Sequence, residues 1–414
     1  MKIINLGSCN IDYVYSLDHI VKVGETEATD RLEIFPGGKG LNQSIAIARA
    51  GSSVFHAGCV GRDGGLLVDL LSESGADVSL LQTVEGQNGH AIIQVDTKGN
   101  NAIFLFAGSN AMVSKDYIEA VLSHFSEGDL LVLQNEISNV DYAIRRAHKR
   151  GLRIVFNPSP FRDAIKEIDF GMLSYLILNE VEAAAISGCE SPEEAVHFFR
   201  EHYPTLGVML TLGEDGCVLI ENGRELWQSA FCVDAVDTTA AGDTFTGYFV
   251  SELAKGSDPK TRLKIACAAS ALAVSRKGAA PSIPTRGEVL SVLSRLTPRD
   301  SHQKDTLLKR KIDEYLDGSL ASATLSGLAK KLGYSSAYTG SLVKRLVGDS
   351  FSKYLQAKRL QLAANLLLNT DLSVEDVIRQ VGYENQSFFR KRFQEKYGKS
   401  PLQFRNREVC QNEQ

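Results

Sequence analysis

The feature that most constrains the fold is a repeat of short apolar segments between residues 117 and 211, each followed by a polar residue and then by a helical pattern. Repeating βα units with near-continuous apolar strands are typical of a mostly parallel sheet covered by helices on both faces. The strands are predicted at Leu130–Leu133, Ile154–Phe156, Tyr175–Leu178 and Val208–Thr211.

Polar residues end these strands, and parallel strands bring such residues to one edge of a sheet, where ligands bind. Any one of them could instead be a simple helix cap. The residues expected along this edge are Glu136, Asn157, Asn179 and Thr211.

The N-terminal part predicts a strand, a glycine loop and a helix, at Ile3–Leu6, Gly37–Gly40 and Asn42–Ala50. Two β-rich patches interrupt the α/β rhythm: Tyr13–Leu17, and Gly89–Leu105 with a hairpin turn at Lys98, Gly99 and Asn100. These patches are predicted to form a small sheet outside the main one, used as a lid.

The stretch Asp237–Phe245 combines three small residues with an acid immediately before a helical pattern. The free N–H groups and dipole of a helix start favour an anion such as phosphate. Asp243 inside such a site indicates proton removal from a hydroxyl, while the N–H groups stabilise a transferring phosphoryl group. The alternative is an ordinary helix start with an acid in its first turn.

Charge divides the chain of 414 residues into two parts. Residues 300–414 carry 19 Lys and Arg against 13 Asp and Glu, net +6, whereas residues 1–299 carry 26 against 37, net −11. An acidic body with a basic tail predicts two functions, the second on a polyanion.

The seven cysteines are scattered and form no CxxC pair, which fits a reducing cytoplasm rather than a disulfide framework or zinc knuckle. The N-terminus has the pattern of a strand rather than of a secretory leader. The longest apolar run, Ile265–Val274, is too short and too rich in Ala to span a bilayer. We therefore expect a cytoplasmic protein without a membrane partner.

Five motifs in order resemble the ribokinase (PfkB) family of sugar and nucleoside kinases across residues 1–296. They are Gly37–Gln43, Asn179–Glu182, Thr211–Gly213, Asp237–Phe245 and Arg276–Ala279. The resemblance implies a ribokinase-like α/β fold with a small β lid, and an enzyme that phosphorylates a sugar hydroxyl with ATP. Ribose is the first expectation; another pentose, a hexose or a nucleoside remains open.

The resemblance assigns roles to matched positions. Asp243 would be the catalytic base, with Ala240, Ala241 and Gly242 as the anion hole. Carboxylates, amides and glycines that allow close approach suit a polyol, and the implied sugar-binding residues are Asn10, Asp12, Gly38, Lys39, Asn42 and Glu136. The implied nucleotide-binding residues are Asn179, Thr211, Gly213, Gly216, Gly242 and Cys267. Cys267 stands where ribokinases often have a His near the adenine.

Two metal sites are also implied. Glu182, with Asn179, would organise Mg²⁺, mostly through water. A loop-built K⁺ (monovalent cation) site, formed largely by backbone carbonyls, would involve Asp237, Thr239, Ala273, Arg276, Gly278 and Ser282.

Beyond residue 300 the pattern is helical without strands. Two helix-turn-helix patterns are predicted, Leu325–Leu332 with Ser336–Val347 and Val374–Val381 with Asn385–Tyr397, joined by a long helix over Phe351–Asn369. The first turn is expected at Gly333, Tyr334 and Ser335.

This part resembles the DNA-binding domain of AraC-type transcription regulators, on Gly382-Tyr383, Phe388-Phe389, Phe393 and Gly398-x-Ser400-Pro401-x-x-Phe404-Arg405. The resemblance implies double-stranded DNA as partner, with two helices in successive major grooves. Asn385, Gln386 and Arg390 are candidate base readers and Lys391 a candidate phosphate contact. The alternative is a helical oligomerisation module.

The expected organisation is a kinase domain over 1–298, a linker over 299–304, a DNA-binding domain over 305–408 and a tail over 409–414. The expected function is a sugar kinase that also acts as a sugar-responsive regulator and that could form a homodimer. The rival interpretations are a catalytically silent sugar-sensing transcription factor, and a kinase whose tail only localises or dimerises it.

Overall fold

The computed structural model describes residues 1–29, 31–97, 100–189, 191–299, 301–332, 334 and 336–409. The chain divides into two compact units, Met1–Arg299 and Asp300–Gln414. Several predicted features lie outside the described residues: Lys98 and Gly99 of the hairpin turn, Gly333 and Ser335 of the first helix-turn-helix, Asp300 of the linker, and 410–414 of the tail.

The first unit is built on a sheet whose strands lie in the order β13-β12-β11-β10-β9-β8-β1-β4-β5. Neighbouring strands run parallel except at β11-β12 and β12-β13. The bounds are β1 Ile3–Leu6, β4 Val54–Val60, β5 Asp77–Thr83, β8 Leu130–Gln134, β9 Arg153–Asn157, β10 Tyr175–Asn179, β11 Gly207–Thr211, β12 Cys217–Glu221 and β13 Arg224–Gln228. The predicted mostly parallel sheet is confirmed, while β5, β12 and β13 had not been predicted.

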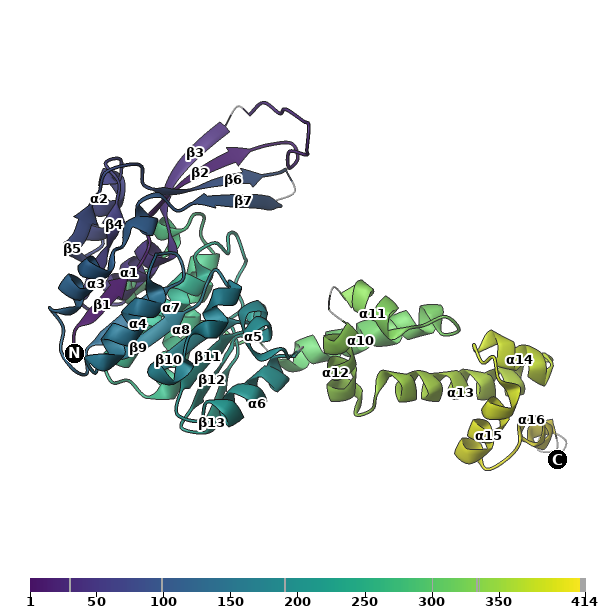
Figure 1. Ribbon diagram of the computed structural model, residues 1–414. Coiled ribbons are helices and arrows are strands. Elements are labelled where there is room, and N and C mark those ends of the chain that lie inside the picture. The colour runs from purple at the N-terminus through teal and green to yellow at the C-terminus, as the bar shows by residue number, and fades with distance from the viewer. Residues whose placement is uncertain are drawn as a thin grey trace. The chain divides into compact units, whose positions relative to one another are not determined.

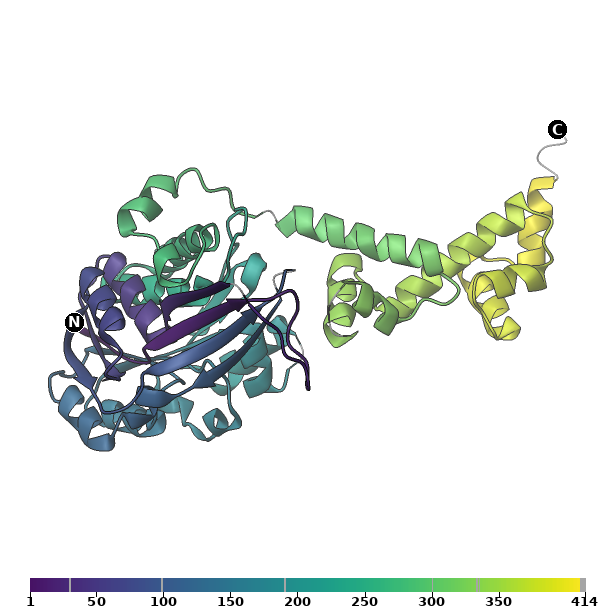
Figure 2. The same cartoon turned by 90° about the horizontal axis from the view of Figure 1, so that it is seen from above.

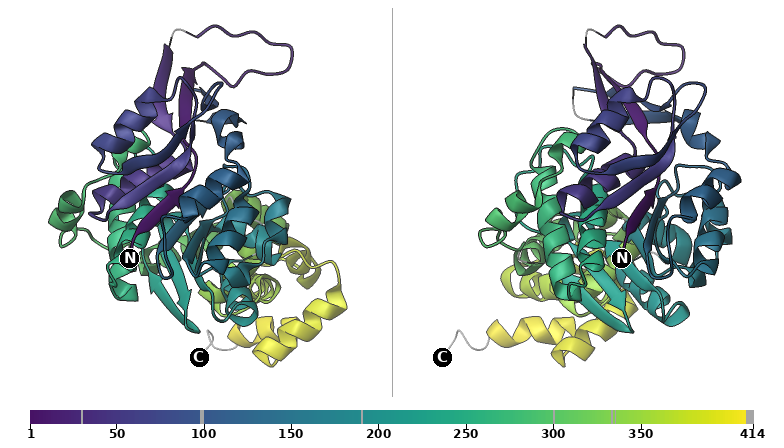
Figure 3. Two further views of the ribbon diagram at one scale, coloured as in Figure 1. Left: turned by 60° about the vertical axis from the view of Figure 1, so that its left-hand side comes forward. Right: turned by 90° about the vertical axis from the view of Figure 1, so that its left-hand side faces the viewer.

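Both faces of this sheet are buried, as the apolar strands predicted. In β8, Leu130 and Val132 join the core on one face, while Leu131 and Leu133 join the core on the other. Helices α1, α2, α7, α8 and α9 cover the first face and α3 to α6 the second (Figure 3). The alternation follows from the two-residue repeat of a strand.

The helices of this unit are α1 Lys39–Arg49, α2 Gly65–Glu73, α3 Lys115–Leu122, α4 Val140–Lys149, α5 Glu180–Ser187, α6 Pro192–His202, α7 Ala241–Ala254, α8 Pro259–Val274 and α9 Arg286–Val292. Short 3₁₀ turns lie at Gly108–Met112, Asp163–Glu167, Phe170–Met172, Gly213–Asp215 and Ala280–Ser282. Local sequence explains several starts. Ser191 and Asp258 cap α6 and α8, and each is followed by proline at the first helical position.

A second sheet, in the order β3-β2-β6-β7, projects from the main one (Figures 1 and 2). Its strands are β2 Asn10–Ser16, β3 Arg31–Gly37, β6 Gly89–Val95 and β7 Asn101–Phe106. The predicted separate small sheet is therefore present. Strand β3 had not been predicted, and β2 begins at Asn10 rather than Tyr13. Asn10 pairs with Gly37 and Gly89, which brings three strand ends together at the base of this sheet.

The second unit consists of α10 Ser301–Ser319, α11 Leu325–Leu332, α12 Ser336–Val347, α13 Phe351–Asn369, α14 Val374–Gln380, α15 Gln386–Tyr397 and α16 Pro401–Val409. The long helix α13 (Figure 1) serves two small cores. Phe351 and Leu355 pack with α10 to α12, and Leu360 and Leu367 pack with α14 and α15. Helix α10 begins within the range expected as a linker, because Ser301 to Lys304 are helical.

Among the described helices, none combines the length and the apolar character that crossing a membrane would require.

Candidate active site

Asp243 lies in the first turn of α7 and is 6% exposed. Its two carboxylate oxygens accept hydrogen bonds from α1: Oδ2 from Asn42 Nδ2 at 3.1 Å and Oδ1 from Gln43 Nε2 at 2.9 Å. The starts of two helices therefore meet at this carboxylate. In the adjoining predicted anion hole, the N–H of Ala241 donates to the Thr238 carbonyl at 3.2 Å. A carboxylate at a helix start can take a proton beside a bound phosphate.

The close approach of α1 and α7 depends on Gly247. A Cβ at this position would fall far inside van der Waals contact of Ala46 Cβ and would also crowd the Gln43 carbonyl. No sequence signal marked Gly247, because its small size matters only through a contact about 200 residues away in the chain.

Gln43 belongs to the glycine-loop motif, but sequence analysis gave it no role. Gln134 Nε2 donates to Gln43 Oε1 at 2.7 Å, which directs the Gln43 amide nitrogen toward Asp243. The same Gln134 nitrogen donates to Asn5 Oδ1 at 2.9 Å, and Asn5 Nδ2 donates to Ser44 Oγ at 2.8 Å. A buried amide network thus supports the carboxylate.

The predicted sugar residues meet at the base of the small sheet. Glu136 accepts hydrogen bonds from the backbone N–H of Lys39 at 2.9 Å and from the Ser8 hydroxyl. Asn10 is buried, and its Oδ1 accepts from Asn110 Nδ2 at 2.7 Å. Sequence analysis missed Ser8 and Asn110, which support these groups from elsewhere in the chain.

Asp12 and Gly38 each lie close to the backbone of a neighbouring segment. Burial, followed by the charge of Glu136, raises the pKa of Asp12 to about 7. A Cβ at Gly37 would collide with the Asp12 carboxylate. Gly38 has a φ of 95°, in the region that favours glycine, and a Cβ there would lie 3.0 Å from the Asn10 nitrogen.

The Lys39 ammonium group interacts with residues from the predicted catalytic, sugar-binding and metal sites. Burial lowers the pKa of its ammonium group, but the charges of Asp243, Glu136 and Glu182 outweigh burial and raise it. Burial also raises the pKa of Glu136 despite the opposing charge of Lys39. The half-buried Lys39 ammonium therefore interacts with carboxylates that were predicted to be catalytic, sugar-binding and metal-organising.

A cavity of about 390 Å³ adjoins the start of α7. Five of the six predicted nucleotide residues line it: Thr211, Gly213, Gly216, Gly242 and Cys267. Ala241, Phe231, Val233, Phe245, Ala271 and Val274 add apolar wall. The volume is in the range of small-molecule sites. Asn179, the sixth predicted residue, does not line this cavity.

Asn179 and Glu182 form a capping box at the start of α5. Asn179 Oδ1 accepts from the Glu182 N–H at 2.9 Å, and Glu182 Oε2 accepts from the Asn179 N–H at 3.0 Å. Helix capping, the alternative considered for Asn179, is thus present. The buried Glu182 carboxylate keeps a second oxygen for a water of Mg²⁺, so the residues fit the indirect coordination expected.

The described residues hold no cluster of three or more His, Cys, Asp or Glu suited to a metal ion. The predicted K⁺ site would use other ligands, and three of its six residues, Asp237, Thr239 and Gly278, are joined by direct hydrogen bonds. Asp237 accepts from the N–H of Thr239 at 2.9 Å and from the N–H of Gly278 at 3.0 Å. Ser282 donates to the Ala279 carbonyl at 2.8 Å. The Ala273 carbonyl accepts from the Arg276 N–H at 3.0 Å.

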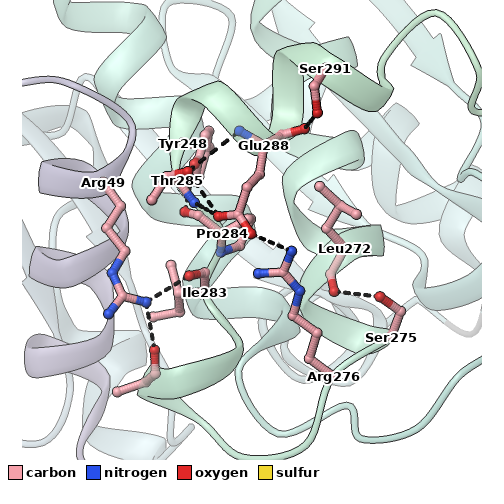
Figure 4. Close-up of polar contacts among 11 residues, drawn as sticks. Arg49, Tyr248, Leu272, Ser275, Arg276, Ile283, Pro284, Thr285, Glu288 and Ser291 are labelled. Carbon is pink, nitrogen blue, oxygen red and sulfur yellow. Dashed lines mark hydrogen bonds and ion pairs between the residues drawn. The ribbon is translucent and has the colours of Figure 1, made fainter.

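The side chain of Arg276 points toward Glu288 and is not placed as a cation ligand (Figure 4). Its guanidinium pairs with Glu288 at 2.7 Å, so only its carbonyl could hold a cation. Hydrogen bonds from the backbone and hydroxyl of Thr285, followed by the charge of Arg276, lower the pKa of Glu288 to about 2. Arg49 donates to the carbonyls of Ala280 and Ile283, and so holds the same loop from α1 (Figure 4).

The candidate DNA-binding residues are exposed at the start and middle of α15. Asn385 caps this helix through a bond from the Phe388 N–H at 2.9 Å, which leaves its amide nitrogen for a base. Arg390 pairs with Glu375 at 2.7 Å, and both side chains are about half exposed. Gln386 and Lys391 lie on the same exposed helix.

Known proteins resemble both units of the chain. Residues 1–286 match the pfkB family of carbohydrate kinases, and residues 328–407 match a helix-turn-helix domain. The ribokinase of Haemophilus influenzae is 36% identical over 299 residues, spanning 70% of this chain and 97% of that protein. The ribokinase of Bacillus subtilis is 33% identical over 296 residues, spanning 70% and 98%.

Solved structures show the same fold. Ribokinase from Thermotoga maritima gives a TM-score of 0.65 at 36% identity, covering 71% of this chain and 99% of that one. Arabidopsis thaliana ribokinase complexed with ribose and ATP gives 0.64 at 27% identity, covering 70% and 98%.

Fold and site therefore define an ATP-dependent sugar kinase, followed in the same chain by a DNA-binding domain of the AraC helix-turn-helix type. The chain belongs to the pfkB family of carbohydrate kinases.

Proposed function

We propose that the first unit transfers the γ-phosphoryl group of ATP to ribose and produces ribose 5-phosphate. The observation that carries this proposal is the buried Asp243 carboxylate, held by Asn42 and Gln43 beside the nucleotide-sized cavity. The ribokinases among the relatives support ribose as the sugar.

In the proposed reaction, Asp243 removes the proton of the sugar hydroxyl as its oxygen bonds to the γ-phosphorus. The bond from that phosphorus to the β–γ bridging oxygen breaks, and ADP leaves. N–H groups of Ala240, Ala241 and Gly242 would stabilise the charge on the transferring group. The residues that would hold the sugar hydroxyls are Asn10, Asp12, Gly38, the half-buried Lys39, Asn42 and Glu136.

Glu182 and Asn179 would hold Mg²⁺ through water, and the ion would supply charge neutralisation on the phosphates. The loop tied together by Asp237 would hold K⁺ close to the anion hole. Its ligands would include carbonyl and side-chain oxygens drawn from Asp237, Thr239, Ala273, Arg276, Gly278 and Ser282. We further propose the boundaries 1–298, 299–304, 305–408 and 409–414 for kinase, linker, DNA-binding domain and tail.

We also propose that the whole chain regulates transcription in response to the sugar it phosphorylates. Asn385, Gln386 and Arg390 would read bases and Lys391 would contact phosphate. We also propose a homodimer, because exposed apolar side chains mark interaction surfaces. Six such side chains on the edge strands of the small sheet are 46–57% exposed: Leu32, Ile34, Ile103, Phe104, Leu105 and Phe106.

The kinase is tested by sugar-dependent ADP release with Mg²⁺ and K⁺, over ribose, other pentoses, hexoses and nucleosides. Turnover on ribose that vanishes in Asp243→Asn is expected. Turnover on a different sugar would reassign the substrate. Sugar binding without any turnover would favour a silent, sugar-sensing transcription factor.

Regulation is tested on a duplex selected by the wild-type chain from a random pool. The proposal expects its affinity to change when sugar and nucleotide are added, and an unchanged affinity would contradict it. Arg390→Ala should weaken binding about 5- to 100-fold, as loss of a base-reading arginine does. Ser336→Ala should have a smaller effect, because Ser341, in the second helix of the first helix-turn-helix, stands where the AraC-type regulators that this domain resembles often have arginine.

A further inference from the structure

Residues 297–299 pair with residues 230–232, a segment that contributes to the wall of the cavity beside α7. The N–H of Cys232 donates to the Thr297 carbonyl at 3.0 Å, and the N–H of Arg299 donates to the Ala230 carbonyl at 2.6 Å. Between these bonds, Phe231 and Pro298 form an antiparallel bridge. Ala230 and Phe231 both line the cavity, so this short bridged segment is held against the cavity wall.

Arg299 also lines the cavity through its own side chain. Its Nη1 donates to Glu214 Oε2 at 2.6 Å and to the Glu214 carbonyl at 3.3 Å. Glu214 belongs to the turn Gly213–Asp215, which directly follows the Thr211-Leu212-Gly213 motif. Because the two side chains are 45% and 61% exposed, their ion pair is weak and can be exchanged for another anion.

Residues 297–299 lie outside the part of the chain that matches the kinase family model, which ends at residue 286. They form instead the segment that leads to α10, which begins two residues after Arg299. The wall of this cavity therefore includes one cationic residue, Arg299, that lies beyond the residues matched by the family model.

We propose that Arg299 is a nucleotide-binding residue whose guanidinium contacts the phosphates of ATP and exchanges its Glu214 partner for them on binding. Guanidinium suits phosphate because its planar fork donates two charge-assisted hydrogen bonds. The inference rests on the cavity being the ATP site of the proposed kinase. It makes the segment before the DNA-binding unit part of that site.

The test is calorimetric titration of the full chain, with Mg²⁺, using the non-hydrolysable β,γ-imido analogue of ATP and, separately, adenosine. Arg299→Ala should weaken binding of the ATP analogue about tenfold, the range for a hydrogen bond to a charged group, and leave adenosine within twofold. Arg299→Lys should recover part of the loss. The matched control is Arg295→Ala, an exposed arginine four residues earlier, which should bind like wild type.

Glu214→Gln separates ligand contact from support of the strand, because it breaks the same ion pair and keeps the guanidinium. The proposal expects it to bind the ATP analogue at least as tightly as wild type. Equal losses for ATP analogue and adenosine in both variants would overturn the proposal in favour of a structural role. Unchanged binding in Arg299→Ala would overturn the role of Arg299 and leave the proposed kinase standing. A wild-type chain that binds no nucleotide would overturn the proposed kinase as well.

Discussion

The amide of Gln43 donates to Asp243 Oδ1 at 2.9 Å, from a helix that begins about 200 residues earlier in the chain than α7. Because Gln134 fixes the other end of this amide, the contact sets the orientation of the carboxylate. The orientation of the Asp243 carboxylate therefore depends on the packing of α1 against α7 as well as on the local loop.

Gln43→Leu is expected to lower kcat about 10- to 100-fold, equivalent to a hydrogen bond to a charged group, with little change in the KM for sugar. The variant retains Asn42, which is one of the proposed sugar-binding residues. Steady-state kinetics of ADP release measure both constants. Gln82→Leu, at an exposed position of β5, is the control. A rise in KM with unchanged kcat would show that Gln43 binds sugar rather than orienting the base.

Gly247→Ala is expected to destabilise the first unit by about 1–3 kcal/mol, the usual cost of overpacking. The added methyl would collide with Ala46 and push α7 from α1. Urea denaturation followed by circular dichroism measures the change. Gly287→Ala in α9 is the matched control, because its Cβ would meet no atom within 4 Å. Equal stability of the two variants would contradict the packing argument.

Asp12 should make folding stability depend on pH. Its folded pKa, raised from 3.8 to about 7, favours the neutral acid, so its stabilising contribution is full below about pH 4 and is lost as the pH rises through 7. The difference in unfolding free energy between wild type and Asp12→Asn should therefore shift against wild type from pH 5 to pH 8. Urea denaturation at each pH measures this difference. A constant difference would mean that Asp12 is ionised throughout.

In the second unit, Gly340→Ala should stabilise the protein by about 1 kcal/mol, the helix-interior cost of glycine. Its Cβ would meet only the Leu325 side chain, at an ordinary 3.6 Å. Gly327→Ala is the contrasting variant, since its Cβ would collide with the Tyr315 hydroxyl. Differential scanning calorimetry of the full chain should show opposite shifts for the two variants in the transition of this unit. Shifts of the same sign would contradict the argument.

The helices and strands found from sequence were those with strong local patterns. The apolar runs became β8 to β11, and the helices Leu325–Leu332, Ser336–Val347 and Phe351–Asn369 have the predicted bounds. Strands β3 and β5 were missed because they are partly exposed and have no continuous apolar run. Strand β12 follows the Gly213–Gly216 turn directly, so it did not stand out as a separate βα unit.

The residues of the candidate site also fall into two groups, those with a local sequence pattern and those without one. The sequence by itself singled out Asp243 and the glycine loop as candidates, because each requires a particular residue type within a short motif. The nucleotide-side residues were implied by the family resemblance, and five of those six line the cavity. Only the tertiary structure revealed Gln43 as the partner of Asp243, Gly247 as the contact that brings the two helices together, and Arg299 as part of the cavity wall. These roles come from contacts between segments that are distant in the chain, and such contacts leave no local pattern.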